Sequence, residues 1–225
     1  MQTRQLRGFL FDLHGVLADS WQYHLASWQT IAQELHIPWT NQLAATLPGM
    51  SRADSLTAIL ASVNRQNEFT PDQCLRITDH ENDLYRQYVA ALTPANCLPG
   101  VTVFLDELVA AGYPMALASA STNASAEIAH LGLAKYFPQI VPAASLKASK
   151  PAPDVYLAAA ALIHQHPEDC VAFEDTVTGV RSAKAAGCFT VGINVKNLPQ
   201  ADAMLASTRE LSLSAVQRTL GQLNV

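Results

Sequence analysis

Four short runs of apolar residues recur along the chain, separated by longer segments of mixed character. The runs cover residues 8–11, 114–118, 170–173 and 189–193. Each run is followed directly by a polar residue: Asp12, Ser119, Glu174 and Asn194 in turn. Their apolar character is continuous rather than alternating, which is typical of strands that are buried on both faces. The pattern therefore predicts strands in the interior of a parallel sheet.

The segments between these runs have the spacing of helices. They cover residues 101–111, 123–130, 153–164 and 177–186. Gly112, Gly132 and Gly187 follow three of them, and glycine just past the last turn is a common way for a helix to end. Strands that alternate with helices predict an α/β fold with a parallel sheet.

Residues 20–91 interrupt this alternation. The segment contains no convincing strand, and helices are predicted over residues 23–35, 52–62 and 71–92. Because it follows the first strand, we interpret it as a helical insertion that caps the carboxyl edge of the sheet, where α/β proteins bind ligands. The predicted domains are a core of residues 1–19 and 92–225 and a helical cap of residues 20–91.

Composition narrows the class of protein. The 225 residues carry a formal net charge of −5 without a run of basic residues, so nucleic acid is not expected as a partner. Apolar stretches fall far below the ~18 residues of a membrane span, and the start of the chain lacks the apolar region of a secretory signal. The four cysteines show no metal-binding spacing and are expected to be free thiols. We therefore expect a soluble cytoplasmic protein without a membrane partner.

Polar clusters follow the predicted strands, and in a parallel sheet they meet at one edge. They are Asp12 with Gly15, the hydroxyl-rich residues 119–123, Lys150, and the pair Glu174 and Asp175. Taken singly, they resemble a turn, a helix N-cap, a loop entering a helix and a solvated strand end. Taken together, they supply the carboxylate nucleophile, anion-binding loop, cation and metal ligands that phosphoryl transfer requires.

The same residues resemble motifs of the haloacid dehalogenase superfamily, and within it the β-phosphoglucomutase-like subfamily. The four motifs correspond to FDLHGVL at 11–17, ALASAS at 116–121, SKPAPD at 149–154 and FEDT at 173–176. In the insertion, His24, Trp28 and PGMSRADSL at 48–56 resemble the cap of the subfamily. The resemblance extends over about residues 8–194 and implies a Rossmann-like core with an inserted helical cap.

The resemblance also implies a reaction and roles for residues. The reaction is Mg²⁺-dependent phosphoryl transfer through an aspartyl phosphate, which interconverts β-D-glucose 1-phosphate and glucose 6-phosphate by way of the 1,6-bisphosphate. Asp12 is then the nucleophile and His14 the acid–base group. Magnesium is held by Asp12, the backbone carbonyl of His14, Glu174 and Asp175. Substrate and phosphate are bound by His24, Trp28, Gly49, Arg52, Ser55, Ser119, Ala120, Ser121, Asn123 and Lys150. The expected partner is a small phosphorylated sugar, and the expected state is a monomer.

Three positions depart from the subfamily pattern. His14 stands where the family has an aspartate as acid and base; imidazole suits the task by its ordinary pKa of ~6.5 but is longer than a carboxylate. Pro48 and Glu81 stand where the cap has lysines. Two alternatives follow: a phosphatase acting on small sugar phosphates, favoured by the missing lysines, and a catalytically impaired phosphosugar-binding protein, favoured by His14.

Some of the histidine and aromatic positions have a second interpretation. If the first strand continued past Asp12, His14 would share its face and could join Glu174 or Asp175 in a site for manganese, iron or zinc. His24 fits a cap-hinge role or a packed core position. Trp28 fits the core of the cap better than a stacking surface for sugar.

Overall fold

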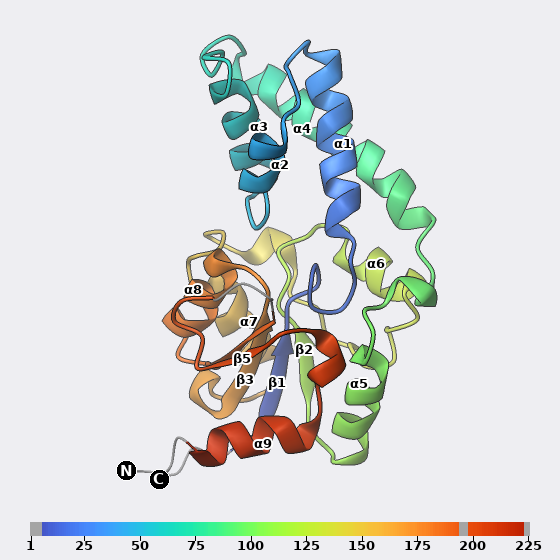
Figure 1. Cartoon of the computed structure of the whole chain (residues 1–225), viewed down its shortest axis with the longest axis vertical. Helices are drawn as coiled ribbons and strands as arrows, with labels where there is room; N and C mark the ends of the chain where they lie inside the picture. Colours follow the sequence, from blue (N-terminus) through green and yellow to red (C-terminus); the bar gives the residue numbers. More distant parts are fainter. Residues whose placement is uncertain (1–5, 194–197, 223–225) are drawn as a thin grey trace. The chain divides into compact units, whose positions relative to one another are not determined.

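The computed structural model describes residues 6–193 and 198–222. Its centre is a five-stranded parallel sheet with the strand order β2-β1-β3-β4-β5 (Figure 1). The strands are β1 (Gly8–Phe11), β2 (Met115–Leu117), β3 (Cys170–Glu174), β4 (Phe189–Ile193) and β5 (Ala203–Leu205). The predicted parallel α/β fold is confirmed. β5 was not predicted, because it has three residues and none of them is fully buried. Asn194, the expected end of β4, lies outside the described residues.

The helices agree with the predicted ones to within two residues at each end. The predicted helices are α1 (Trp21–Glu34), α3 (Arg52–Ala61), α4 (Pro71–Ala90), α5 (Val101–Ala110), α6 (Ala124–His130), α7 (Asp154–Leu162) and α8 (Val177–Ala185). The helices that were not predicted are α2 (Asn41–Thr46), α9 (Leu213–Gln222) and the short 3₁₀ helices η1 (Pro94–Asn96), η2 (Ala143–Ser145), η3 (Pro167–Asp169) and η4 (Thr208–Glu210). α2 and the 3₁₀ helices are too short to show a helical period.

Both faces of the sheet are buried, as the continuous apolar runs predicted. Phe9 and Phe11 of β1 point to one face and join a core cluster with α5. Leu10 points to the other face, where it packs with the alanine-rich α7. On the first face Phe173 of β3 stacks on Phe11, with ring centroids 4.9 Å apart, and meets the edge of Phe104 at 5.5 Å. This aromatic cluster fixes the central strands β1 and β3 against α5.

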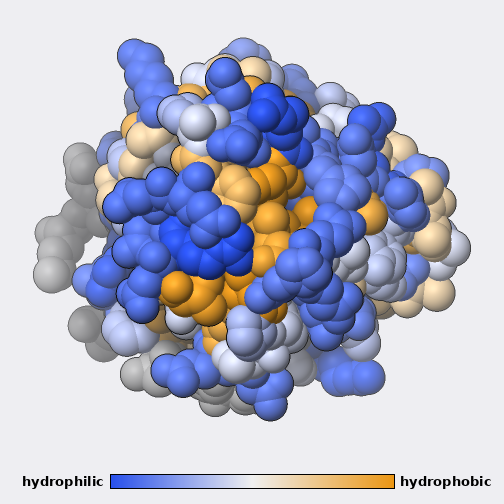
Figure 2. Space-filling model, turned by 90° about the horizontal axis from the view of Figure 1, so that it is seen from above, coloured by the Kyte–Doolittle hydropathy of each residue, from blue (hydrophilic) through white to orange (hydrophobic). Residues whose placement is uncertain are grey.

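The chain divides into two compact units, residues 1–19 with 92–225 and residues 20–91. The second unit is entirely helical in its regular structure and has its own core around Trp28, Ile31 and Ile59. In this unit a hollow of about 330 Å³ lies between α1 and α4; it is lined by Ile31, Glu34, Leu35, Phe69, Gln73, Arg76, Ile77 and His80. Figure 2 shows apolar side chains bordered by hydrophilic ones on this unit's surface.

No helix among the described residues combines the length and apolar character that crossing a membrane requires. All four cysteines are free thiols, as their spacing predicted.

We predict that Phe173→Ala lowers the free energy of unfolding by about 3–5 kcal/mol, because it removes the ring on which the aromatic cluster packs. Urea unfolding measures the loss. Val103→Ala is the control, since this side chain is 63% exposed and its truncation should change stability by less than about 0.5 kcal/mol. Equal effects of the two substitutions would contradict the packing described here.

Candidate active site

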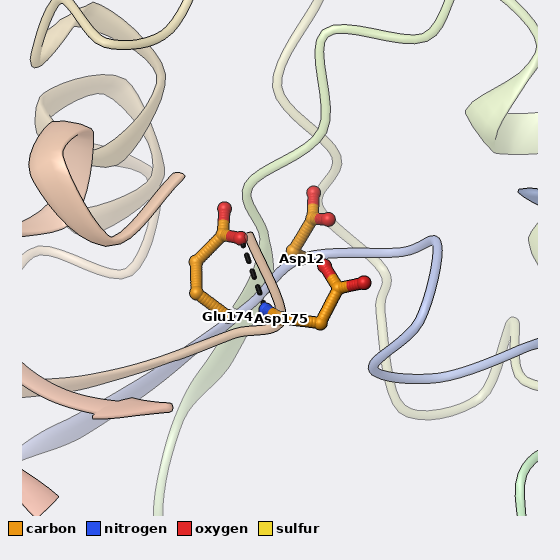
Figure 3. A group of neighbouring side chains, drawn as sticks. All are labelled: Asp12, Glu174 and Asp175. Atoms are coloured by element: carbon orange, nitrogen blue, oxygen red, sulfur yellow. Dashed lines mark hydrogen bonds between the residues drawn. The ribbon is translucent and has the colours of Figure 1, made fainter. Parts of the chain in front are cut away.

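Three carboxylates meet at the carboxyl edge of the sheet because β1 and β3 are neighbours in register. Phe11 of β1 pairs with Phe173 of β3, so Asp12 follows the one strand beside Glu174 at the end of the other. Asp175 comes next, and ligand atoms of the three residues lie within 4.8 Å of one another (Figure 3). Chain order places β2 and β3 on opposite sides of β1, which is the kind of switch point where α/β proteins bind ligands.

Lys150 joins two of these carboxylates. Its Nζ donates to Asp12 Oδ1 at 2.8 Å and to Glu174 Oε1 at 2.5 Å. The hydroxyl of Tyr156, a fully buried residue of α7, donates to the same Glu174 oxygen at 2.8 Å. Lys150 also lies 5.2 Å from the centre of the Tyr156 ring. Tyr156 was missed by sequence reasoning, because its position on α7 reads as one more buried core residue.

The electrostatics of the group favour a bound cation. Burial alone lowers the pKa of Lys150, but the carboxylates of Asp12 and Glu174 outweigh it and leave the pKa above its usual value. Burial raises the pKa of Asp175 well above its ordinary range, and the neighbouring Glu174 and Asp12 charges add to this. One lysine therefore faces three acidic groups. A divalent cation would relieve the remaining repulsion.

The donor set fits a hard divalent cation. Carboxylate oxygens are the ligands of Mg²⁺ and Ca²⁺, and among the described residues these three form the one group suited to hold a metal. Gly15 lets the loop after β1 close on this group: its φ is +77°, and a Cβ there would lie 2.0 Å from Asp175 Oδ2. A side chain at position 15 would displace the Asp175 carboxylate.

The alternative site for manganese, iron or zinc is wrong, because it required β1 to continue to residue 14. β1 ends at Phe11, and the chain then turns through Gly15. The imidazole of His14 is not in the carboxylate group. Instead its Nδ1 lies 3.8 Å from Oε2 of Glu127, a fully buried residue of α6 that sequence reasoning also missed.

The hydroxyl-rich loop after β2 lies beside Asp12. The Ala118 N–H donates to the Phe11 carbonyl at 2.7 Å, which ties this loop to the end of β1. Within it, Ser119 Oγ accepts from the Ser121 N–H at 3.2 Å, and Ser121 Oγ accepts from the Asn123 N–H at 3.1 Å. Ser119 is buried, whereas Ala120 is exposed. Of the predicted phosphate-binding residues of the core unit, Ser119, Ala120, Ser121 and Asn123 thus share one loop beside Asp12, and Lys150 reaches Asp12 from a different segment.

In the helical unit, the buried Glu81 pairs with the partly buried His24. His24 Nδ1 lies 3.3 Å from Glu81 Oε1, and the imidazole stacks on the Tyr85 ring with 3.5 Å between ring centroids. Glu81 is fully buried, and burial raises its pKa to about 7 although the Arg52 charge lowers it. Glu81 is therefore an interior partner of His24 rather than an exposed negative charge.

The other predicted cap residues differ in exposure. Trp28 is 2% exposed and belongs to the core of the helical unit, as the favoured interpretation of this residue predicted. Ser55 is likewise buried. Gly49 has a φ of +80° in the turn before α3, and Arg52 is the half-buried first residue of that helix. Of the predicted cap residues, Gly49 and Arg52 thus lie where the chain enters α3, and neither belongs to the core of the helical unit.

An α/β core with an aspartate, a lysine and two further acids at its switch point defines a class of phosphoryl-transfer proteins, and comparisons with known proteins agree. The haloacid dehalogenase-like hydrolase family matches residues 9–193. The chain is 32% identical over 221 residues to a β-phosphoglucomutase of Bacillus subtilis (strain 168), covering 98% of each chain. It is 29% identical over 216 residues to hexitol phosphatase A of Escherichia coli (strain K12), covering 92% of this chain and 94% of that one.

A solved structure has the same fold. The crystal structure of a β-phosphoglucomutase from Clostridium difficile matches with a TM-score of 0.93 at 29% identity, over 98% of this chain and 99% of that one. The chain therefore belongs to the haloacid dehalogenase-like hydrolase family, and the resemblance to its β-phosphoglucomutase-like subfamily is confirmed. Its relatives include both mutases and sugar phosphatases, so the chain is a phosphatase or phosphomutase of this family.

We predict that saturating Mg²⁺ raises the melting temperature of the protein by several degrees, because a cation that binds only the folded state stabilises it. Asp175→Asn should lose most of this rise, since it removes one of the three carboxylates. Glu168→Gln, which removes an exposed carboxylate of η3, at the opposite end of β3 from the site, should keep it. Differential scanning calorimetry with and without Mg²⁺ measures both; an undiminished rise in Asp175→Asn would count against this metal site.

We predict that Glu81 makes stability fall as the pH rises. The pKa of Glu81 is about 7 in the folded protein against an ordinary 4.5, so its favourable contribution is complete below about pH 4.5 and is lost as pH rises to about 7. The free energy of unfolding of the protein minus that of Glu81→Gln should therefore decrease over this window, by roughly 3 kcal/mol at most.

Denaturant unfolding at a series of pH values measures the difference. The matched control is Asp79→Asn, an exposed acid on the same helix α4, which should show no such decrease. A difference between Glu81→Gln and the unmodified protein that stays constant with pH would show that burial does not perturb Glu81.

Proposed function

We propose that the protein catalyses Mg²⁺-dependent phosphoryl transfer through an aspartyl phosphate, acting on β-D-glucose 1-phosphate and glucose 6-phosphate by way of the 1,6-bisphosphate. The observation that carries the proposal is Asp12, fixed by Lys150 at 2.8 Å and adjoining two further acids at the end of β1. A carboxylate held this way is oriented as a nucleophile, and the positive charge of Lys150 is already in place beside it.

Each residue of the core then has a part in the transfer. A carboxylate oxygen of Asp12 attacks the phosphorus and forms a bond to it, while the bond between phosphorus and the sugar oxygen breaks. Lys150, the Ser119 hydroxyl and the Ala120 N–H stabilise the charge on the transferring group. His14 gives a proton to the leaving sugar oxygen and takes one from the attacking hydroxyl.

The metal would be held by Asp12, Glu174, Asp175 and the backbone carbonyl of His14. When bound, Mg²⁺ offsets negative charge on the phosphoryl oxygens and on the acidic group around them. The three carboxylates support this assignment because they lie close together and Lys150 alone does not balance their negative charge.

Residues 20–91 are proposed as a cap that binds the distal part of the substrate and excludes water during transfer. Arg52 and Gly49, at the start of α3, would bind the second phosphate of the bisphosphate together with Ser121 and Asn123 of the core. His24 and Ser55 would support this region from the interior of the cap. The proposed partner is a small phosphorylated sugar, and the proposed state is a cytoplasmic monomer.

A second candidate function is hydrolysis of sugar phosphates. Glu81 stands at the cap position where the subfamily has a lysine. Its carboxylate is buried and pairs with His24, so this position offers no positive charge to a phosphate. Pro48 likewise replaces a lysine. A cap with a weaker hold on the bisphosphate would let water attack the aspartyl phosphate in place of the sugar hydroxyl.

We predict that the enzyme with Mg²⁺ and a trace of glucose 1,6-bisphosphate converts β-glucose 1-phosphate to glucose 6-phosphate without releasing phosphate. Asp12→Asn should lower kcat by about 10⁴-fold or more, because it removes the nucleophile. Asp72→Asn, which alters an exposed acid of α4, should keep full activity.

A coupled assay that records glucose 6-phosphate and free phosphate together separates the candidates. Release of free phosphate without glucose 6-phosphate would refute the mutase function and support the phosphatase function. Turnover that survives Asp12→Asn would refute the covalent mechanism for both.

A further inference from the structure

Glu127 is a buried carboxylate with no evident structural need. It lies in the first turn of α6, among small and apolar residues, and is fully buried. Burying a carboxylate is costly unless hydrogen bonds or a charge partner compensate. The helix N-terminus favours a negative charge there but would do so for an exposed one too.

The two carboxylate oxygens of Glu127 have different surroundings. Oε1 accepts a hydrogen bond from Ser121 Oγ at 3.2 Å, which fixes how the carboxylate is turned. Oε2 is buried, has no hydrogen-bond partner among the described residues, and lies 3.8 Å from Nδ1 of His14. A shift of about 1 Å would make this a hydrogen bond, and such contacts often tighten when substrate binds.

We propose that Glu127 is a positioning residue for His14. It accepts the Nδ1–H of the imidazole, fixes the tautomer, and leaves Nε2 as the nitrogen that exchanges a proton with substrate. The inference rests on the proposed function, in which His14 replaces a carboxylate as acid and base. An imidazole needs such a partner because either of its two nitrogens can carry the proton, and the partner decides which one does. A carboxylate as acid and base has no such tautomers and needs no such partner.

The proton balance of the transfer is then complete. When a sugar hydroxyl attacks the aspartyl phosphate, its oxygen bonds to phosphorus while the bond from phosphorus to the Asp12 oxygen breaks. The hydroxyl proton moves to Nε2 of His14, and the other proton stays on Nδ1, where it is donated in a hydrogen bond to Glu127 Oε2. In the transfer to Asp12, the imidazolium returns the Nε2 proton to the leaving sugar oxygen.

The tautomer of His14 tests the contact without any turnover. In long-range proton–nitrogen NMR spectra of the ¹⁵N-labelled protein at about pH 8, His14 should carry a proton on Nδ1. His14→Asn assigns the signals. Glu127→Met, which removes the acceptor, should shift the proton toward Nε2, while Ser125→Ala, at an exposed position of the same helix, should not. An unchanged tautomer in Glu127→Met overturns the proposal.

Kinetics supply the second test. Glu127→Gln should lower kcat by about 10–10²-fold with little change in KM, because orientation of the acid–base group acts in the transition state. In a His14→Asp background the same substitution should cost nothing or raise kcat, since Glu127 would there face a like charge. Equal losses in both backgrounds would indicate a purely structural role and overturn the proposal.

Two precautions keep the test decisive. If Glu127→Gln does not fold, Glu127→Met, an apolar side chain of similar length, removes the acceptor without an unsatisfied polar group. Because the spectra need no substrate, they decide the Glu127–His14 contact even where no sugar phosphate is turned over. Failure of the proposed function would appear only in the product assay.

Discussion

The register of β1 between β2 and β3 is the constraint on which the site depends. Because the strands are parallel and paired residue for residue, the chain that leaves β1 at Asp12 emerges beside Glu174 and beside the loop after β2. This gathers negative charge in a buried place, which is unfavourable unless it is balanced. Lys150 supplies part of the balance by bonding to Asp12 and Glu174 at once, and Tyr156 supplies a further hydrogen bond to Glu174. The remaining excess of acid over base makes the edge suited to a cation and to phosphate chemistry.

Among the described residues, each compact unit has one histidine–glutamate pair in which the carboxylate is fully buried and the imidazole is partly buried. His24 faces Glu81 in the helical unit, and His14 faces Glu127 in the core unit. In both pairs the carboxylate is fully buried and one of its oxygens has no hydrogen-bond partner among the described residues. The pairs differ in their surroundings, because the His24 ring stacks on Tyr85, while His14 stands in the loop directly after Asp12, the proposed nucleophile. The first arrangement is suited to holding helices together, and the second to transferring a proton.

The two candidate functions share their first half. In the proposed mechanism, formation of the aspartyl phosphate needs Asp12, Lys150 and the loop of Ser119, which all lie in the core unit. What separates a mutase from a phosphatase is whether a sugar hydroxyl or water attacks next. We expect that choice to depend on the proposed proton acceptor, His14, and on the proposed binding of a second phosphate by residues 20–91. Mutases and phosphatases can therefore be related in sequence over nearly the whole chain, as the relatives of this protein are.

The sequence by itself determined the order of strands and helices, because continuous apolar runs and helical spacing are local properties that burial imposes on the chain. It also placed Asp12, Lys150, Glu174 and Asp175 at the edge of the sheet, since each follows its own strand or adjoins a loop there. Tertiary structure alone decided which groups touch. Lys150 and Asp12 are 138 residues apart, and the partners of the buried carboxylates come from different elements of their unit. No local pattern distinguishes Tyr156 or Glu127 from neighbouring helix positions. Their roles follow from the packing of α7 and α6, which sets a hydroxyl against Glu174 and a carboxylate against His14.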